Sequence, residues 1–262
     1  MPYAEIAGHD VYYEMSGQGS QMLALFNGIT MSTAAWALLQ PQLEPHFQLL
    51  RFDFLGQGQS DHPGGDKYPL SEQADLAAGL LNHLGIDQVY LTGLSYGGMV
   101  AQHFAHRHPQ RVSRLLLAAT LAWADSVNNR ISDSWLAANL SGGLDLRYAV
   151  SVPWLFSSRF LASNAALLDD MKLIAGMVDW DAVIRLIAGV ADHDARTWLH
   201  ELTMPCHILV GDEDRLTPLY QAELLHERLP GAQLEILPGV AHVLHIEAAD
   251  AFVRSIIRFG QG

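Results

Sequence analysis

A serine enclosed by glycines, directly after a run of apolar residues, constrains this chain more than any other feature. Residues 92–98 read Thr-Gly-Leu-Ser-Tyr-Gly-Gly and follow the apolar run 89–91. A strand-to-helix turn this tight forces its serine into a strained backbone conformation and leaves room only for very small neighbours. The three glycines supply those neighbours. The pattern therefore predicts a strand, a sharp turn that exposes Ser95 as a nucleophile, and a helix over residues 99–108.

Apolar runs of strand length alternate with segments of helical periodicity along most of the chain. Near-continuous apolar strands between helices are typical of a parallel sheet that is covered on both faces. The sequence therefore predicts an α/β fold with a mostly parallel central sheet and helices on both faces. The expected strands are 11–15, 22–26, 48–52, 88–91, 112–118, 206–210 and 233–237, and the expected helices are 33–43, 71–84 with Ser71 as its N-cap, 99–108, 218–229 and 245–259.

This alternation is interrupted between residues 122 and 202, where no clear strand occurs and several helical patterns follow one another. We interpret this segment as a helical cap inserted into an α/β core formed by residues 1–121 and 203–262. Five of the six tryptophans lie in the segment. They suit the packing of the cap itself, and we expect two of them, Trp123 and Trp154, to contact a substrate.

Composition narrows the class of protein. Half of the 262 residues are hydrophobic and only 16% are charged, so the chain can bury a sizeable core. A formal net charge of -13 argues against nucleic-acid or anionic-membrane partners. No run of eighteen apolar residues and no signal-peptide pattern is found, so we expect a cytoplasmic protein that is free to form a homodimer. The single cysteine, Cys206, lies in an apolar run and is expected to be a buried strand residue.

A serine hydroxyl becomes a nucleophile only when a base accepts its proton. Of thirteen histidines, His242 is the best candidate, because it follows an expected strand and precedes the last expected helix. That position lies at the carboxyl edge of a parallel sheet, where sites assemble. His245, about one helical turn later, is the alternative base.

The base in turn needs a carboxylate to orient it. Residues 211–218 contain three acids in a row after an expected strand, again at the carboxyl edge of the sheet. We assign the role to Asp214, with Asp212 and Glu213 as alternatives. The resulting order of serine, acid and histidine is that of a serine hydrolase built on an α/β sheet.

A tetrahedral oxyanion needs preorganised donors. One is expected to be the backbone N–H of Tyr96, directly after the serine. The second is expected to be the N–H of Ile29, in the loop that follows the strand ending at Phe26.

These segments together resemble the α/β-hydrolase superfamily, in its capped esterase, lactonase and thioesterase branch. The resemblance covers nearly the whole chain outside the insertion. It rests on the serine turn, on residues 53–60 (Asp-Phe-Leu-Gly-Gln-Gly-Gln-Ser), on the acid loop 211–218, and on 239–242 with Glu247 five residues further on. The resemblance implies the α/β-hydrolase fold with a helical cap. It also implies that Asp214 is the family's aspartate, which stands three residues after the glycine of this loop.

One departure from the family concerns the oxyanion loop. Many relatives have His-Gly where this chain has Asn27-Gly28. Together with residues 32–36, this loop resembles that of bacterial hydroxyacyl-transfer and thioesterase relatives that handle 3-hydroxyacyl chains. We therefore expect Asn27 and Gly28 to contact an acyl substrate.

The expected function is hydrolysis of an ester, thioester or lactone of a small or medium apolar acyl substrate. The reaction would use Ser95, His242 and Asp214, form an acyl-enzyme, and require no metal or cofactor. Hydrolysis of a carbon–carbon bond in a ring-cleavage product is an alternative, since it uses the same three groups. A third alternative is a non-catalytic receptor on the same scaffold, although such a receptor does not need all three residues.

Overall fold

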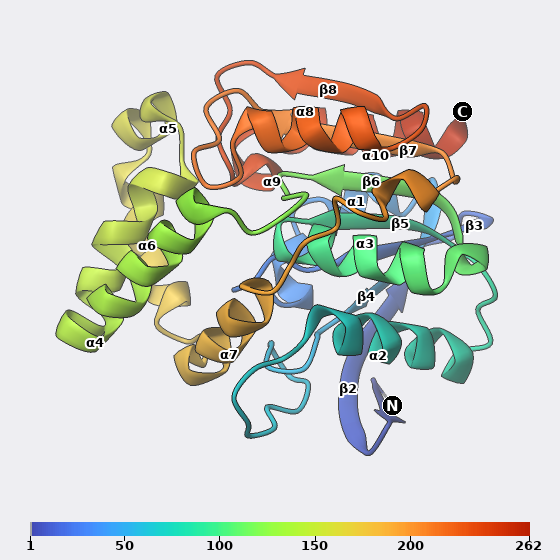
Figure 1. The fold of residues 1–262 in the computed structure, drawn as a ribbon, viewed down its shortest axis with the longest axis horizontal. Helices are drawn as coiled ribbons and strands as arrows, with labels where there is room; N and C mark the ends of the chain where they lie inside the picture. Colours follow the sequence, from blue (N-terminus) through green and yellow to red (C-terminus); the bar gives the residue numbers. More distant parts are fainter. Residues whose placement is uncertain (1) are drawn as a thin grey trace.

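The computed structural model describes residues 2–262 and is built around an eight-stranded sheet (Figure 1). The strand order is β1-β2-β4-β3-β5-β6-β7-β8. Every pair from β4 to β8 is parallel, whereas β1 and β2 run antiparallel at one edge. The strands are β1 Tyr3–Ile6, β2 His9–Ser16, β3 Gln21–Phe26, β4 Phe47–Phe52, β5 Val89–Leu94, β6 Val112–Ala118, β7 Cys206–Gly211 and β8 Gln233–Leu237.

Side chains alternate along each strand and so point to both faces of the sheet, and helices bury both of these faces. In β6, Leu115 and Leu117 pack on one face, while Leu116 and Ala118 pack on the other. The first face is covered by α2 (Leu70–His83), α3 (Tyr96–Arg107) and α8 (Leu219–Arg228). The second face is covered by α1 (Gln40–Leu43) and α10 (Ala249–Gln261) (Figure 1). The predicted α/β class with helices on both faces is confirmed.

Four local predictions were wrong or incomplete. Helix α2 begins after Pro69, which already has the extended backbone of an N-cap, so Ser71 is not the cap. Residues 33–43 form a 3-10 turn, Thr33–Trp36, before the short α1 instead of one helix. The last helix is divided into α9 (Leu244–Glu247) and α10, because Ala248 has non-helical backbone angles. Strand β1 was missed altogether.

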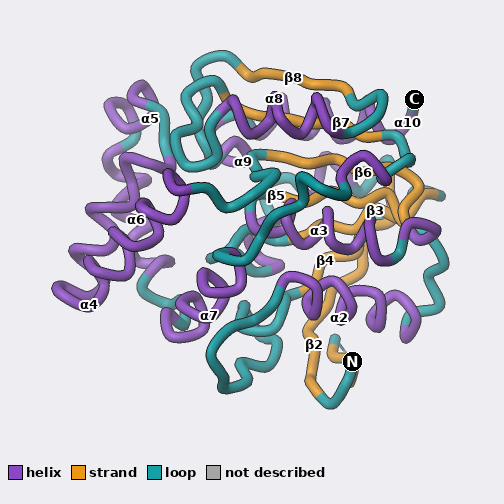
Figure 2. The backbone as a smooth tube through the Cα atoms, in the orientation of Figure 1, coloured by secondary structure: helices purple, strands orange, loops and turns teal. Residues whose placement is uncertain are grey.

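The segment between β6 and β7 contains helices and one isolated bridge, between Trp123 and Asp194. Helix α4 is kinked where Gly142 and Gly143 leave helical geometry. Figure 2 shows α4, α5 and α6 projecting beyond one end of the sheet, with α7 closer to it. The helices are α4 Ser126–Leu155, α5 Ser158–Ser163, α6 Ala165–Ala175 and α7 Trp180–Val190, and the return to the sheet passes through a 3-10 turn, Leu199–Glu201.

Within residues 2–262, no helix combines the length and the apolar character that crossing a membrane requires.

Candidate active site

Ser95 occupies the predicted turn between β5 and α3 with φ 54° and ψ −115°, a conformation that L-residues rarely adopt. The glycines around Ser95 are required because a Cβ atom at either position would collide with the backbone. A Cβ on Gly97 would lie 2.3 Å from the carbonyl oxygen of Phe26, and one on Gly93 would lie 2.5 Å from that of Gly97. Thr120 holds the turn by donating its hydroxyl to the Ser95 carbonyl at 2.7 Å. The surrounding structure thus fixes the strained serine with its side chain at the carboxyl edge of the sheet.

The structure brings together the three side chains that the sequence singled out. His242 Nε2 lies 2.9 Å from Ser95 Oγ, and His242 Nδ1 lies 3.0 Å from Asp214 Oδ2. The histidine and aspartate are buried, whereas Ser95 is partly exposed. With Nδ1–H donating to the carboxylate, Nε2 is left unprotonated and faces the hydroxyl. This geometry allows the imidazole to accept the serine proton.

Backbone and side-chain donors fix Asp214 in place. Its Oδ1 accepts the N–H groups of Leu216 and Thr217 at 3.0 and 2.8 Å. Its Oδ2 accepts the Thr217 hydroxyl at 2.6 Å as well as the imidazole. Thr217 was not predicted as a site residue, although it stands only three residues after Asp214; its hydroxyl oxygen also lies 3.2 Å from His242 Nδ1.

The alternative acids and the alternative base lie elsewhere. Asp212 accepts the N–H of Gly239, and Glu213 accepts that of Ser158. His245 is buried with its ring 6.4 Å from that of Trp36, and burial lowers its pKa to about 3. Among these groups in the described chain, His242 is the one within hydrogen-bond reach of Ser95, and Asp214 is the carboxylate within reach of His242.

The two expected oxyanion donors have no competing partner in the described chain. Within residues 2–262, neither the N–H of Ile29 nor that of Tyr96 is found in a hydrogen bond. Tyr96 is the first residue of α3, so its N–H is one of the groups that a helix leaves unpaired. Gly28 is buried in the adjoining loop, with its N–H 3.1 Å from the sulfur of Met31.

Asn27 does not have the role that we expected. Its side chain is fully buried, donates to the Phe52 carbonyl at 2.9 Å, and accepts the Trp36 indole N–H at 2.7 Å. No polar atom of this amide remains for a substrate. We therefore reassign the Asn27 side chain from substrate contact to support of the loop, a role that the Asn-Gly pattern alone does not reveal.

The two tryptophans expected at the substrate pocket have separate surroundings. The Trp123 ring lies 3.9 Å from the Arg196 guanidinium, near the start of the insertion. Trp154 packs against a small apolar cluster that contains Ile131, Trp135 and Leu216. Since Leu216 adjoins Asp214, this cluster connects the insertion with the acid loop.

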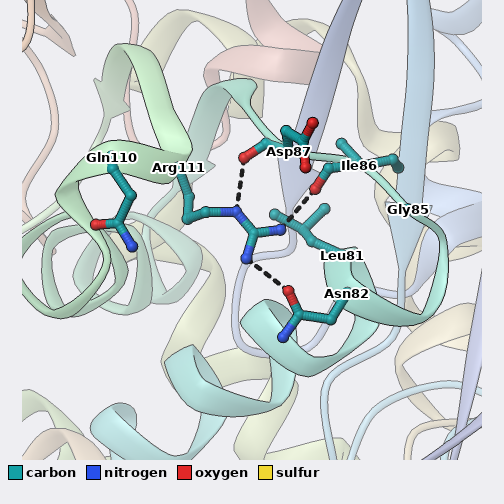
Figure 3. Close-up of a pocket in the computed structure, with 7 residues that line it drawn as sticks. All are labelled: Leu81, Asn82, Gly85, Ile86, Asp87, Gln110 and Arg111. Atoms are coloured by element: carbon teal, nitrogen blue, oxygen red, sulfur yellow. Dashed lines mark hydrogen bonds between the residues drawn. The ribbon is translucent and has the colours of Figure 1, made fainter.

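A hollow of about 410 Å³ lies away from Ser95, Asp214 and His242 (Figure 3). Its residues precede β5 and β6, whereas Ser95 follows β5, so the hollow is at the opposite edge of the sheet. Arg111 donates there to the carbonyls of Asp87 and Ile86 and to the Asn82 side chain. These contacts bind the loop before β5 to the turn before β6.

The chain belongs to the alpha/beta hydrolase fold family, which matches residues 22–249. It is 30% identical over 240 residues to a poly(3-hydroxyalkanoate) depolymerase of Ectopseudomonas oleovorans, covering 91% of this chain and 84% of that protein. An alpha/beta hydrolase enzyme from a Medee basin deep-sea metagenome library superposes with a TM-score of 0.94 at 28% identity, covering 99% of this chain and 97% of that one. The enol-lactonase of Burkholderia xenovorans LB400 shares the fold, with a TM-score of 0.89 at 24% identity over the full length of both chains. The relatives named as hydrolases support hydrolase activity.

Proposed function

We propose that this protein is a serine hydrolase that cleaves a carboxylic ester, thioester or lactone through an acyl-enzyme. The single observation that carries the proposal is the position of the His242 imidazole, which lies within 3.0 Å of both the Ser95 hydroxyl and the Asp214 carboxylate. A hydroxyl, an imidazole and a buried carboxylate in this order are the groups that nucleophilic acyl transfer requires.

Each step follows from this arrangement. Ser95 Oγ attacks the substrate carbonyl carbon while His242 Nε2 takes its proton, and Asp214 stabilises the imidazolium. The carbonyl oxygen becomes an oxyanion that accepts the N–H groups of Ile29 and Tyr96. The intermediate then expels the alcohol or thiol, which takes the proton from His242. Water repeats the sequence on the acyl-enzyme, releases the acid and restores Ser95.

Two observations favour an apolar acyl substrate. The insertion meets the acid loop through the buried cluster of Ile131, Trp135 and Leu216, so apolar side chains pack against the loop that carries Asp214. The depolymerase relative is named for a polyester of 3-hydroxy acids. Esters of 3-hydroxyalkanoates therefore belong in the first panel of substrates.

A fluorophosphonate probe tests the nucleophile, and an ester panel tests the substrate class. We expect the probe to label the wild-type protein at Ser95 and to leave Ser95→Ala unlabelled. We expect Ser95→Ala to lower kcat by at least about a thousandfold on p-nitrophenyl esters and 3-hydroxyacyl esters, because the attacking atom is lost.

The same probe, and a substrate panel extended to thioesters and a vinylogous diketone, would identify a wrong assignment. A folded protein that is not labelled at all would favour a receptor on the same scaffold. Hydrolysis of a vinylogous diketone in preference to every ester and thioester would favour carbon–carbon bond cleavage. More than a few per cent of activity in Ser95→Ala would remove Ser95 from the mechanism.

A further inference from the structure

A buried glutamine, Gln57, contacts the backbone of the oxyanion loop. It lies in the loop between β4 and α2, and only 3% of its surface is exposed. Its amide nitrogen donates to the carbonyl oxygen of Gly28 at 2.8 Å and approaches that of Ile29 at 3.2 Å. No other side chain within residues 2–262 donates to these two carbonyls.

The contact with Gly28 controls the direction of the Ile29 N–H, because both groups belong to one peptide unit. A trans peptide is planar, so its N–H points away from its C=O. The Met31 N–H donates to the Gly28 oxygen at 3.0 Å, on the same side of the peptide as Gln57. Holding the carbonyl by these two donors turns the Ile29 N–H the opposite way, where it is unpaired.

The orientation of the Gln57 amide is itself fixed. Its oxygen accepts the Asn27 side-chain N–H at 3.3 Å and the Phe54 N–H at 3.4 Å. Reversing the amide would place its oxygen against the Gly28 and Ile29 carbonyls and its nitrogen against two donors. Asn27 is in turn held by Trp36 and by the β4 carbonyl of Phe52. The network therefore directs the Gln57 side-chain nitrogen toward the Gly28 and Ile29 carbonyl oxygens.

We propose that Gln57 is a positioning residue of the oxyanion hole, which acts by orienting the Gly28–Ile29 peptide so that the Ile29 N–H faces the developing oxyanion. The inference rests on the proposed function and adds a residue to the same site. Gln57 does not touch the substrate, so its loss is expected to weaken transition-state stabilisation and to leave substrate binding largely intact.

Gln73 provides a matched control. It is also a buried glutamine, with 1% of its surface exposed, and its amide makes two hydrogen bonds to Leu55 in the same loop as Gln57. It has no bond to Gly28 or Ile29 in the described chain. Replacing Gln57 by methionine removes four side-chain hydrogen bonds and replacing Gln73 removes two, all of them at this loop, but only the Gln57 replacement releases the Gly28–Ile29 peptide.

The experiment compares Gln57→Met, Gln73→Met and wild type on p-nitrophenyl butyrate. We expect Gln57→Met to lower kcat by about 10- to 100-fold with little change in KM, somewhat less than the loss of a whole oxyanion donor. Inhibition by phenylboronic acid, which forms a tetrahedral adduct on the serine, should weaken by a similar factor. Gln73→Met should lower the thermal stability and keep both kcat and boronate affinity near the wild-type values.

A second readout does not depend on activity. The amide resonance of Ile29 in ¹⁵N-isoleucine-labelled protein, assigned by comparison with Ile29→Val, should shift in Gln57→Met and stay in place in Gln73→Met. If Gln57→Met does not fold, Gln57→Glu serves instead, because an ionised glutamate keeps the acceptor for Asn27 and cannot donate to Gly28.

Equal losses of kcat in the Gln57 and Gln73 variants would overturn the inference, as would an Ile29 resonance that does not respond to Gln57. A wild-type protein that neither reacts with fluorophosphonate nor hydrolyses the ester would contradict the proposed function. In that case the Ile29 resonance still decides whether Gln57 orients the peptide.

Discussion

His242 and His245 stand three residues apart and have opposite surroundings. His242 is placed between a hydroxyl and a carboxylate, so both of its ring nitrogens have polar partners. His245 packs beside Trp36 on the second face of the sheet, and within residues 2–262 its Nδ1 has no hydrogen-bond partner. The same side chain is therefore suited to proton transfer at one position and to packing at the other.

This contrast gives a first prediction. We expect His242→Ala to lower kcat by about a thousandfold or more, because the serine loses its base. His245→Ala should leave kcat near the wild-type value and lower the unfolding free energy by about 1 to 3 kcal/mol, since it opens a cavity in the core. Steady-state kinetics and urea unfolding of both variants check this, and a larger kcat loss in His245→Ala would show that we chose the wrong base.

The glycines of the serine turn give a second prediction. Gly97→Ala would place a methyl carbon 2.3 Å from the Phe26 carbonyl oxygen, which is backbone and cannot turn aside. We expect this variant either to fail to fold or to lose most of its fluorophosphonate labelling. Gly64→Ala is the control, because a Cβ at Gly64 meets nothing within 4 Å. Normal labelling of a stable Gly97→Ala protein would contradict the requirement for glycine.

At the scale of elements, the segment that joins α4 to α5 is attached directly to α9 and to the residue before it, just after His242. The Glu247 carboxylate of α9 accepts both the N–H and the hydroxyl of Ser157, at 2.9 and 2.6 Å. The Val243 N–H donates to the Leu155 carbonyl at 3.2 Å. The insertion is thus held beside the histidine loop by hydrogen bonds as well as by apolar packing.

Removing this attachment should have a measurable cost. We expect Glu247→Ala to lower the unfolding free energy by about 1 to 3 kcal/mol, because the two Ser157 donors lose a charged acceptor. Glu227→Ala, on the exposed side of α8, should change it by less than about 0.5 kcal/mol. Urea denaturation of the two variants measures the difference, and equal stabilities would mean that the contact contributes nothing.

At the scale of the whole molecule, several histidines are buried in the neutral form. Burial lowers the pKa of His103 to about 4 and the pKa of His193 to about 3. His103 Nε2 lies 3.3 Å from His193 Nδ1, and His193 Nε2 lies 3.2 Å from the Leu121 carbonyl oxygen. Nε2 of His193 therefore carries the proton, and its Nδ1 accepts the N–H of His103. His106, Arg107 and Asp194 are the charged or titratable groups that influence this pair most directly.

The sign of the resulting pH dependence is fixed by these shifts. An unfolded histidine takes up a proton near pH 6.5, while the folded ones remain neutral down to about pH 4 or 3. Between those values the unfolded chain binds more protons, so stability falls as the pH falls. Each buried histidine contributes a slope of up to about 1.4 kcal/mol per pH unit.

We therefore expect stability to decrease from pH 7 to pH 5, before most carboxylates titrate. His193→Gln should reduce this slope, because one buried neutral imidazole is removed. Thermal unfolding at several pH values in this range measures both effects. A stability that is constant between pH 7 and pH 5 would contradict the burial of neutral histidines.

The sequence by itself determined the periodic features. Apolar runs and glycine spacing predicted seven strands and the serine turn, because burial on both faces and steric crowding act on neighbouring residues. They also singled out Ser95, which directly follows β5, and Asp214 and His242, which lie in the loops after β7 and β8. The predicted helix boundaries were less reliable: Ser71 is not the N-cap of α2, and Ala248 divides the helix that was predicted to be continuous.

The tertiary structure alone decided which polar side chains face the site and which support it. Asn27 and Gln57 lie thirty residues apart and form one network only because β3 and β4 are neighbours in the sheet. Sequence periodicity reports whether a residue is buried, and it carries no information on which distant donor will meet which carbonyl. Hydrogen bonds across the fold depend on strand order and register, and these are fixed only when the whole sheet has formed.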